Sequence, residues 1–139
     1  MEPKIVISLC LLGIDCNYTG GNSLCEKAVE LFASGRGVPV CPEQLGGLST
    51  PRIPAEIQGD RVINRDGEDV TVQFRKGAEQ AARLARLAGC TGALLKSKSP
   101  SCGVGQIYDG TFSGGLIDGD GLLTRELKKL GIKVETEEG

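Results

Sequence analysis

Histidine is missing from this 139-residue chain, and its absence removes several kinds of active site. A Ser-His-Asp triad, a Cys-His pair and a histidine-ligated zinc site all require this residue. Proton transfer must therefore use Asp, Glu, Lys, Tyr, Cys or water. Any metal must be held by cysteine thiolates or carboxylates.

Long apolar runs and an excess of basic charge are missing as well. The chain has no run of about 18 apolar residues and no signal-peptide pattern. Its formal net charge is −2, so bulk charge offers no face for nucleic acid. We therefore expect a soluble, cytoplasmic protein that binds neither a membrane nor nucleic acid in bulk. The length predicts a single domain over residues 1–139, with a substantial core.

Cysteine and glycine are abundant. Six cysteines suggest disulfides at first sight, but secreted disulfide scaffolds are usually shorter and rich in loops. Because the chain has long helical patterns and no export signal, we expect reduced thiols. Its 21 glycines among 139 residues are well above the average glycine usage of about 7%. They cluster just past polar motifs, where glycine lets the backbone turn tightly or approach a ligand closely.

Strand and helix patterns alternate along the chain. Short apolar runs predict core strands at residues 4–9, 38–41, 92–96 and 132–135, with a further strand or hairpin arm at 61–64. Apolar residues at helical spacing predict helices from the capping box at 23–26 to about 34, at about 70–88 and at 120–130. The polar stretches 42–54 and 97–115 are predicted loops, and loops of that length are usually functional. The alternation predicts an α/β fold, a Rossmann-like three-layer sandwich with a mainly parallel sheet and helices on both faces.

Three cysteines stand where predicted strands end and Gly/Pro-rich polar loops begin, namely Cys10, Cys41 and Cys102. Strand ends in a parallel sheet converge on one edge, where ligands bind, so these thiols are candidates for one shared site. Three thiolates without histidine suit a soft metal centre, an iron–sulfur cluster above all. The alternative is that each thiol packs as a small hydrophobe. Their spacing matches no local metal signature such as C-x2-C.

The other three cysteines have different settings. Cys25 lies on the apolar face of a predicted helix, and Cys90 stands between a helix and a strand, so both are expected in the core. Cys16 shares a loop with Cys10 and stays open between a fourth ligand, a resolving thiol and loop packing.

Acidic, hydroxyl and cationic side chains accompany the strand-end cysteines. Glu43 follows Cys41 by two residues, where it is either an acid or base of the site or a solvated loop residue. Ser99 and Ser101 either donate hydrogen bonds to a substrate or initiate a turn. Lys98 and the nearby Lys96 either add positive potential at the mouth of the site or are solvated.

Five segments together resemble a known family, the domain of unknown function 523 family. They span nearly the whole chain in the order of the family: SLCLLGIDCNYTGG, VPVCPEQLGGLSTPRIPAEI, VINRDGEDVT, LLKSKSPSCG and IYDGTFSGGL. Within that family the chain is similar to thiouracil desulfidases and to the catalytic half of 4-thiouridine desulfidases.

The resemblance implies a cofactor and roles for five residues. It implies a [4Fe-4S] cluster held by Cys10, Cys41 and Cys102, with the catalytic carboxylate on Glu43 and the catalytic serine on Ser101. The implied reaction is a non-redox desulfidation, in which a thiolated pyrimidine base or nucleoside binds the open iron and loses its sulfur as sulfide. The alternative is a small-molecule binding or redox-sensing module, cluster-bearing or thiol-based, without desulfidase activity.

Overall fold

A four-stranded parallel sheet forms the centre of the structure, a computed structural model that describes residues 2–139. The strands stand in the order β2-β1-β5-β8, so the central pair is flanked by one strand on each side. Because all of them run in parallel, their carboxyl ends lie on one edge of the sheet. Their bounds are β1 (Lys4–Ser8), β2 (Gly37–Val40), β5 (Cys90–Leu95) and β8 (Lys133–Thr136).

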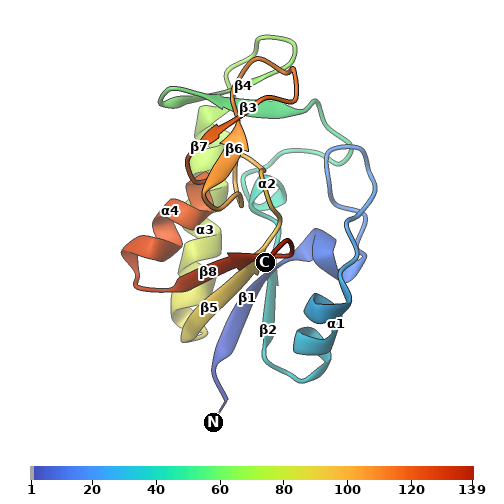
Figure 1. Cartoon of the computed structure of the whole chain (residues 1–139), viewed down its shortest axis with the longest axis vertical. Helices are drawn as coiled ribbons and strands as arrows, with labels where there is room; N and C mark the ends of the chain where they lie inside the picture. The colour runs from blue at the N-terminus through green and yellow to red at the C-terminus, as the bar shows by residue number, and fades with distance from the viewer. Residues whose placement is uncertain (1) are drawn as a thin grey trace.

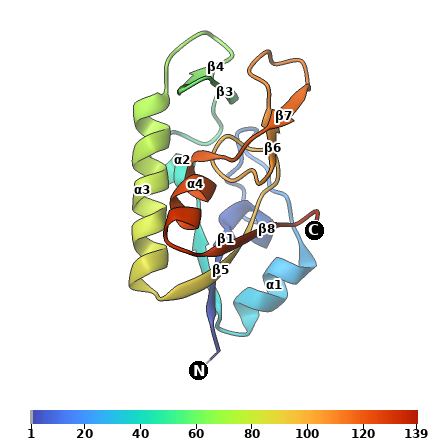
Figure 2. The same ribbon diagram turned by 60° about the vertical axis from the view of Figure 1, so that its left-hand side comes forward.

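Helices cover both faces of the sheet, as Figures 1 and 2 show. On one face α1 (Glu26–Ala33) packs against Ile7 and Leu94. On the other face α3 (Thr71–Leu87) and α4 (Leu122–Lys129) pack against Val6 and Leu95. Neighbouring strand residues are thus buried on opposite faces, which explains the continuous apolar runs of the sequence. The predicted three-layer α/β sandwich with a parallel sheet is confirmed.

Two small hairpins stand beyond the carboxyl edge of the sheet (Figure 1). One pairs β3 (Ala55–Gln58) with β4 (Arg61–Asn64), and the other pairs β6 (Gln106–Tyr108) with β7 (Leu116–Asp118). Sequence patterns predicted a hairpin arm at 61–64 but a loop at 97–115, because β6 has only three residues. The hairpins share a hydrophobic cluster with α3, formed by Ile57, Val62, Phe74 and Ile107.

Two short helical turns begin where strands end, namely η1 (Leu9–Leu12) after β1 and α2 (Pro42–Leu45) after β2. The backbone of α2 lies directly on that of α3. A Cβ on Gly77 would overlap the carbonyl oxygen of Pro42, and one on Gly46 would overlap the carbonyl oxygen of Gln73. These two glycines therefore set the position of α2, and with it the position of Glu43. None of the helices in residues 2–139 combines the length and apolar character that a membrane crossing requires.

Candidate functional site

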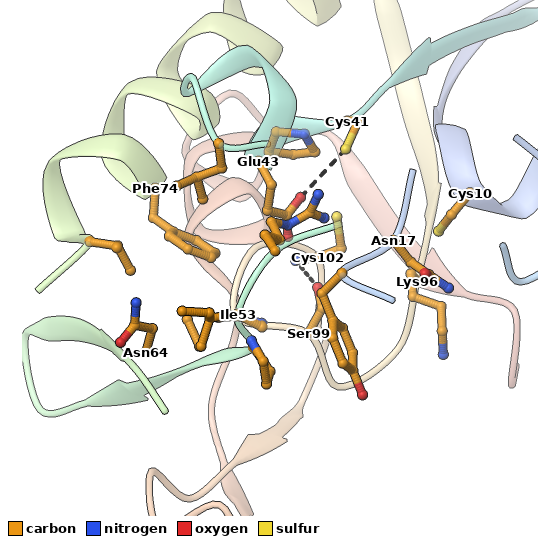
Figure 3. Close-up of a pocket in the computed structure, with 18 of the residues that line it drawn as sticks. Cys10, Asn17, Cys41, Glu43, Ile53, Asn64, Phe74, Lys96, Ser99 and Cys102 are labelled. Carbon is orange, nitrogen blue, oxygen red and sulfur yellow. Dashed lines mark hydrogen bonds between the residues drawn. The ribbon is translucent and has the colours of Figure 1, made fainter. Parts of the chain in front are cut away.

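A cavity of about 840 Å³ lies at the carboxyl edge of the sheet, where β1, β2 and β5 end (Figure 3). Its walls come from these strand ends, from α2, from the start of α3 and from both hairpins. The volume falls in the range of about 300–1,000 Å³ that is usual for small-molecule sites. The cavity thus lies at the edge of the parallel sheet where α/β proteins commonly bind ligands.

Four of the six cysteines line this cavity. Cys10 lies in η1 directly after β1, and Cys41 is the N-cap residue of α2 directly after β2. Cys102 lies in the loop after β5, and Cys16 in the loop between η1 and α1. The structure therefore brings the three strand-end cysteines to one cavity and adds a fourth thiol. The other two cysteines, Cys25 and Cys90, pack in hydrophobic clusters and do not line the cavity.

The four thiols differ in their affinity for protons. A hydrogen bond from the Cys16 thiol lowers the pKa of Cys10, and it does the same for the pKa of Cys41, against the opposing effects of burial and of the Glu43 charge. Cys16 has one proton to share between these two neighbours, and sharing it raises the pKa of Cys16 itself. Burial raises the pKa of Cys102, whose side chain is 3% exposed. Cys10 and Cys41 therefore ionise most readily and are suited to bind a cation.

Glu43 reaches into the cavity from the first turn of α2, as Figure 3 shows. Pro42 at the start of the helix fixes the chain direction there. The Oε2 atom of Glu43 lies 3.8 Å from the Sγ atom of Cys41, which donates a hydrogen bond to it. A carboxylate at this position can take a proton from, or return one to, a molecule held beside the cysteines.

The loop after β5 places only one of the predicted residues Lys98, Ser99 and Ser101 at the cavity. Ser99 lines the cavity, and its Oγ atom accepts a hydrogen bond from the backbone N of Cys102 at 2.7 Å. Ser101 is fully buried outside the cavity lining, and its Oγ has no hydrogen-bond partner within residues 2–139. Lys98 also lies outside the lining and forms an ion pair with Glu138 at 3.4 Å. Of these three residues, Ser99 is the one that the structure brings to the cavity.

Arg52 lines the cavity and was missed by the sequence analysis. Its Nη2 atom donates to the carbonyl oxygen of Cys16 at 3.0 Å, and its Nη1 atom donates to that of Ser49 at 3.2 Å. The guanidinium thus ties the loop of Cys16 to the loop that precedes β3. An arginine in the proline-rich stretch PRIP was visible in the sequence, but nothing there indicates which loop it holds.

Glu56 joins the two hairpins and was also missed. Its Oε1 atom accepts hydrogen bonds from the backbone N of Gly110 at 2.9 Å and of Phe112 at 3.1 Å. Phe112 has a left-handed backbone with φ 57°, a conformation that costs a bulky residue free energy and needs support from its surroundings. The Arg65 guanidinium lies 5.8 Å from the centre of the Phe112 ring. The buried carboxylate therefore holds Phe112 as part of the cavity wall.

The donor set at the strand ends fits a polynuclear iron–sulfur cluster better than a single ion. Among the residues that the structure describes, no three cysteine or carboxylate side chains are close enough to bind one metal ion. A cubane cluster instead takes one thiolate on each of several irons, so its ligands stand further apart. Soft cysteine donors from three separate strand ends, with no histidine among them, suit such a cluster.

Known proteins resemble this chain over almost its whole length. The sequence model of a family described as 2-thiouracil desulfurase matches residues 5–139. An uncharacterized protein of Bacillus subtilis (strain 168), YbbK, is 41% identical over 143 residues, which cover 96% of this chain and 95% of that protein. A solved structure of the [4Fe-4S]-dependent thiouracil desulfidase TudS is 45% identical, has a TM-score of 0.93, and is matched over 99% of this chain and 92% of its own. The chain is therefore similar to these proteins in sequence, and to the solved desulfidase structure in fold as well.

Proposed function

Because this chain belongs to the 2-thiouracil desulfurase family, we propose that it removes sulfur from a thiolated pyrimidine, of the 2-thiouracil or 4-thiouracil type, and releases it as sulfide. The observation that carries the proposal is the meeting of Cys10, Cys41 and Cys102 with Glu43 in one cavity. In this proposal the three cysteines hold a [4Fe-4S] cluster. Six free thiols favour a reducing compartment, so we include the cytoplasm as the place of action.

The proposed reaction is a hydrolysis and needs no electrons from outside. Water supplies an oxygen to the ring carbon, the carbon–sulfur bond breaks, and sulfur leaves as hydrogen sulfide. When bound, the cluster supplies a soft Lewis acid for the thiocarbonyl sulfur. Glu43 takes a proton from the attacking water on its carboxylate and returns it to the departing sulfur or to the ring.

The cavity lining suits a planar, partly polar ring. Phe74, Tyr108 and Phe112 offer aromatic surface, and Asn64 and Ser99 offer hydrogen-bonding groups. Aromatic walls with a few placed polar groups are usual for such ligands. Ser99 is a candidate for contact with the substrate because it lines the cavity, and Ser101 is kept as the catalytic serine through the family resemblance.

An anaerobic turnover experiment tests the proposal. The protein is reconstituted with iron and sulfide, its iron is counted, and it is incubated with 2-thiouracil and separately with 4-thiouracil. We expect uracil and sulfide in equal amounts from at least one of them. A loaded cluster with no sulfide from any thiopyrimidine base or nucleoside would favour a binding module instead. Iron near zero, with reversible disulfide formation, would favour a thiol-based redox protein.

Glu56→Ala should weaken substrate binding while leaving the cluster in place. The change removes both hydrogen bonds that hold the loop of Phe112, so we expect KM for the thiopyrimidine to rise about tenfold, with little change in kcat. Steady-state kinetics and iron content measure the two effects. Glu56→Gln keeps an oxygen acceptor and should recover much of the affinity. Loss of kcat at unchanged KM would contradict this role.

A further inference from the structure

Ser8 lies between the C-terminal end of β5 and Cys102. It is the last residue of β1, and its side chain is 3% exposed. Its Oγ atom is 2.9 Å from the backbone N of Lys96 and 3.3 Å from the Sγ atom of Cys102. Cys102 is 94 residues away in the sequence, so only the fold brings the hydroxyl to this sulfur.

The direction of both hydrogen bonds follows from the chemistry of the groups. A backbone N–H can only donate, so the Ser8 oxygen accepts from Lys96. The hydroxyl has one proton left to donate, and the Cys102 sulfur is the acceptor that it reaches. The Lys96 amide therefore orients the serine so that its O–H points at the sulfur.

Cys102 differs in this respect from the other two predicted ligands. The Sγ atom of Cys41 lies near the carbonyl of Cys16 at 3.9 Å and the carboxylate of Glu43 at 3.8 Å, and its donors are the Cys16 thiol and the Gln44 backbone. Within residues 2–139, neither Cys10 nor Cys41 receives a hydrogen bond from a serine or threonine hydroxyl. Cys102 thus receives a hydroxyl hydrogen bond, whereas the side-chain donor to Cys10 and Cys41 is the weaker thiol of Cys16, so the three sulfurs are electronically unequal.

We propose that Ser8 is a positioning residue that tunes the cluster through Cys102, drawing electron density from that thiolate and thereby from the iron it binds. This inference rests on the proposed ligand role of Cys102. Hydrogen bonds to ligand sulfurs stabilise the more electron-rich state of a cluster and raise its reduction potential. The same withdrawal makes the cluster a stronger Lewis acid toward a substrate sulfur. Ser8 acts through the ligand and does not touch the substrate.

Redox titration of the holoenzyme, followed by electron paramagnetic resonance, tests this role. Ser8→Ala should shift the midpoint potential of the cluster to a more negative value. Ser8→Thr keeps the hydroxyl and should stay near the wild type. The matched control is Thr124→Val, which removes another fully buried hydroxyl beside the same cysteine. That hydroxyl donates to the carbonyl oxygen of Cys102 at 3.1 Å and not to its sulfur, so the potential should not change.

The outcomes separate this inference from the proposed function. Equal potentials in wild type and Ser8→Ala, with iron fully loaded, would overturn the role of Ser8 and leave the proposed function standing. A wild-type protein that binds no cluster would overturn both. If neither Ser8 variant keeps its iron, the role of Ser8 is tested by a measurement on protein that retains Ser8. Electron–nuclear double resonance in H2O and D2O is then recorded on Cys16→Ala protein, which lacks the thiol donor to Cys10 and Cys41. It must reveal an exchangeable proton that is coupled to the cluster and preserved when Thr124→Val is added, and its absence would refute the inference.

Discussion

Cys41→Ala protein, reconstituted anaerobically, should hold well below the roughly four irons per chain of a complete [4Fe-4S] cluster. Cys41 is one of three thiolates proposed to hold the cluster, it is 9% exposed, and its lowered pKa favours the ionised form that binds iron. Release of sulfide from thiouracil should fall by about 10³-fold or more, because about 4 kcal/mol of barrier reduction would be lost with the cluster. Iron analysis and a sulfide assay on the same sample measure both effects.

Cys25→Ala is the matched control for this experiment. Cys25 is a half-buried free thiol that packs beside α1 and does not line the cavity. Its removal should leave iron content and sulfide release close to those of the wild type. Full iron and full activity in Cys41→Ala would refute the ligand assignment. Because Cys16 donates a hydrogen bond to Cys41, a double variant that also lacks Cys16 excludes replacement of the lost ligand by its neighbour.

Glu43→Gln should separate catalysis from cluster binding. The amide keeps the size of the side chain but cannot take a proton from water, and loss of a general base typically costs about 10²–10⁴-fold in rate. We expect kcat to fall by this amount while the iron content stays that of the wild type. Steady-state kinetics at saturating thiouracil, together with iron analysis, provides the measurement.

Glu79→Gln is the corresponding control for a change of carboxylate to amide. Glu79 is exposed on α3 and does not line the cavity, so kcat should be unchanged. A Glu43→Gln enzyme with wild-type kcat would show that a group other than Glu43 transfers the proton. Ser99 and Ser101 would then be the residues to vary next.

The meeting of the strand-end cysteines at one cavity could be anticipated from the sequence because it depends on a general property of parallel sheets. Cys10 and Cys41 each follow a short apolar run that predicts a core strand, and parallel strands end on one edge of the sheet. The same reasoning covers Glu43, which is two residues past Cys41. Local pattern was sufficient because each of these residues stands next to the strand that positions it.

Other parts of the site depend on contacts that no local pattern records. Glu56 holds Phe112 across 56 residues of sequence, and the strands that bring them together have only three or four residues. The choice between Ser99 and Ser101 depends on how the loop after β5 turns, since the two serines are chemically equivalent in the motif. Only the structure distinguishes the serine at the cavity from the one enclosed in the core.

The two hairpins line the cavity but contain none of the proposed cluster ligands, and this separation matters for engineering. Each hairpin pairs its strands within itself, apart from the four-stranded sheet, and Glu56 and Gln58 of the first bond to the turn of the second. The proposed cluster ligands and Glu43 all come from other segments of the chain. A mutant library confined to residues 55–64 and 106–118 should therefore vary which thiolated molecule enters the cavity. It would leave unchanged the residues that we propose carry out the desulfurisation.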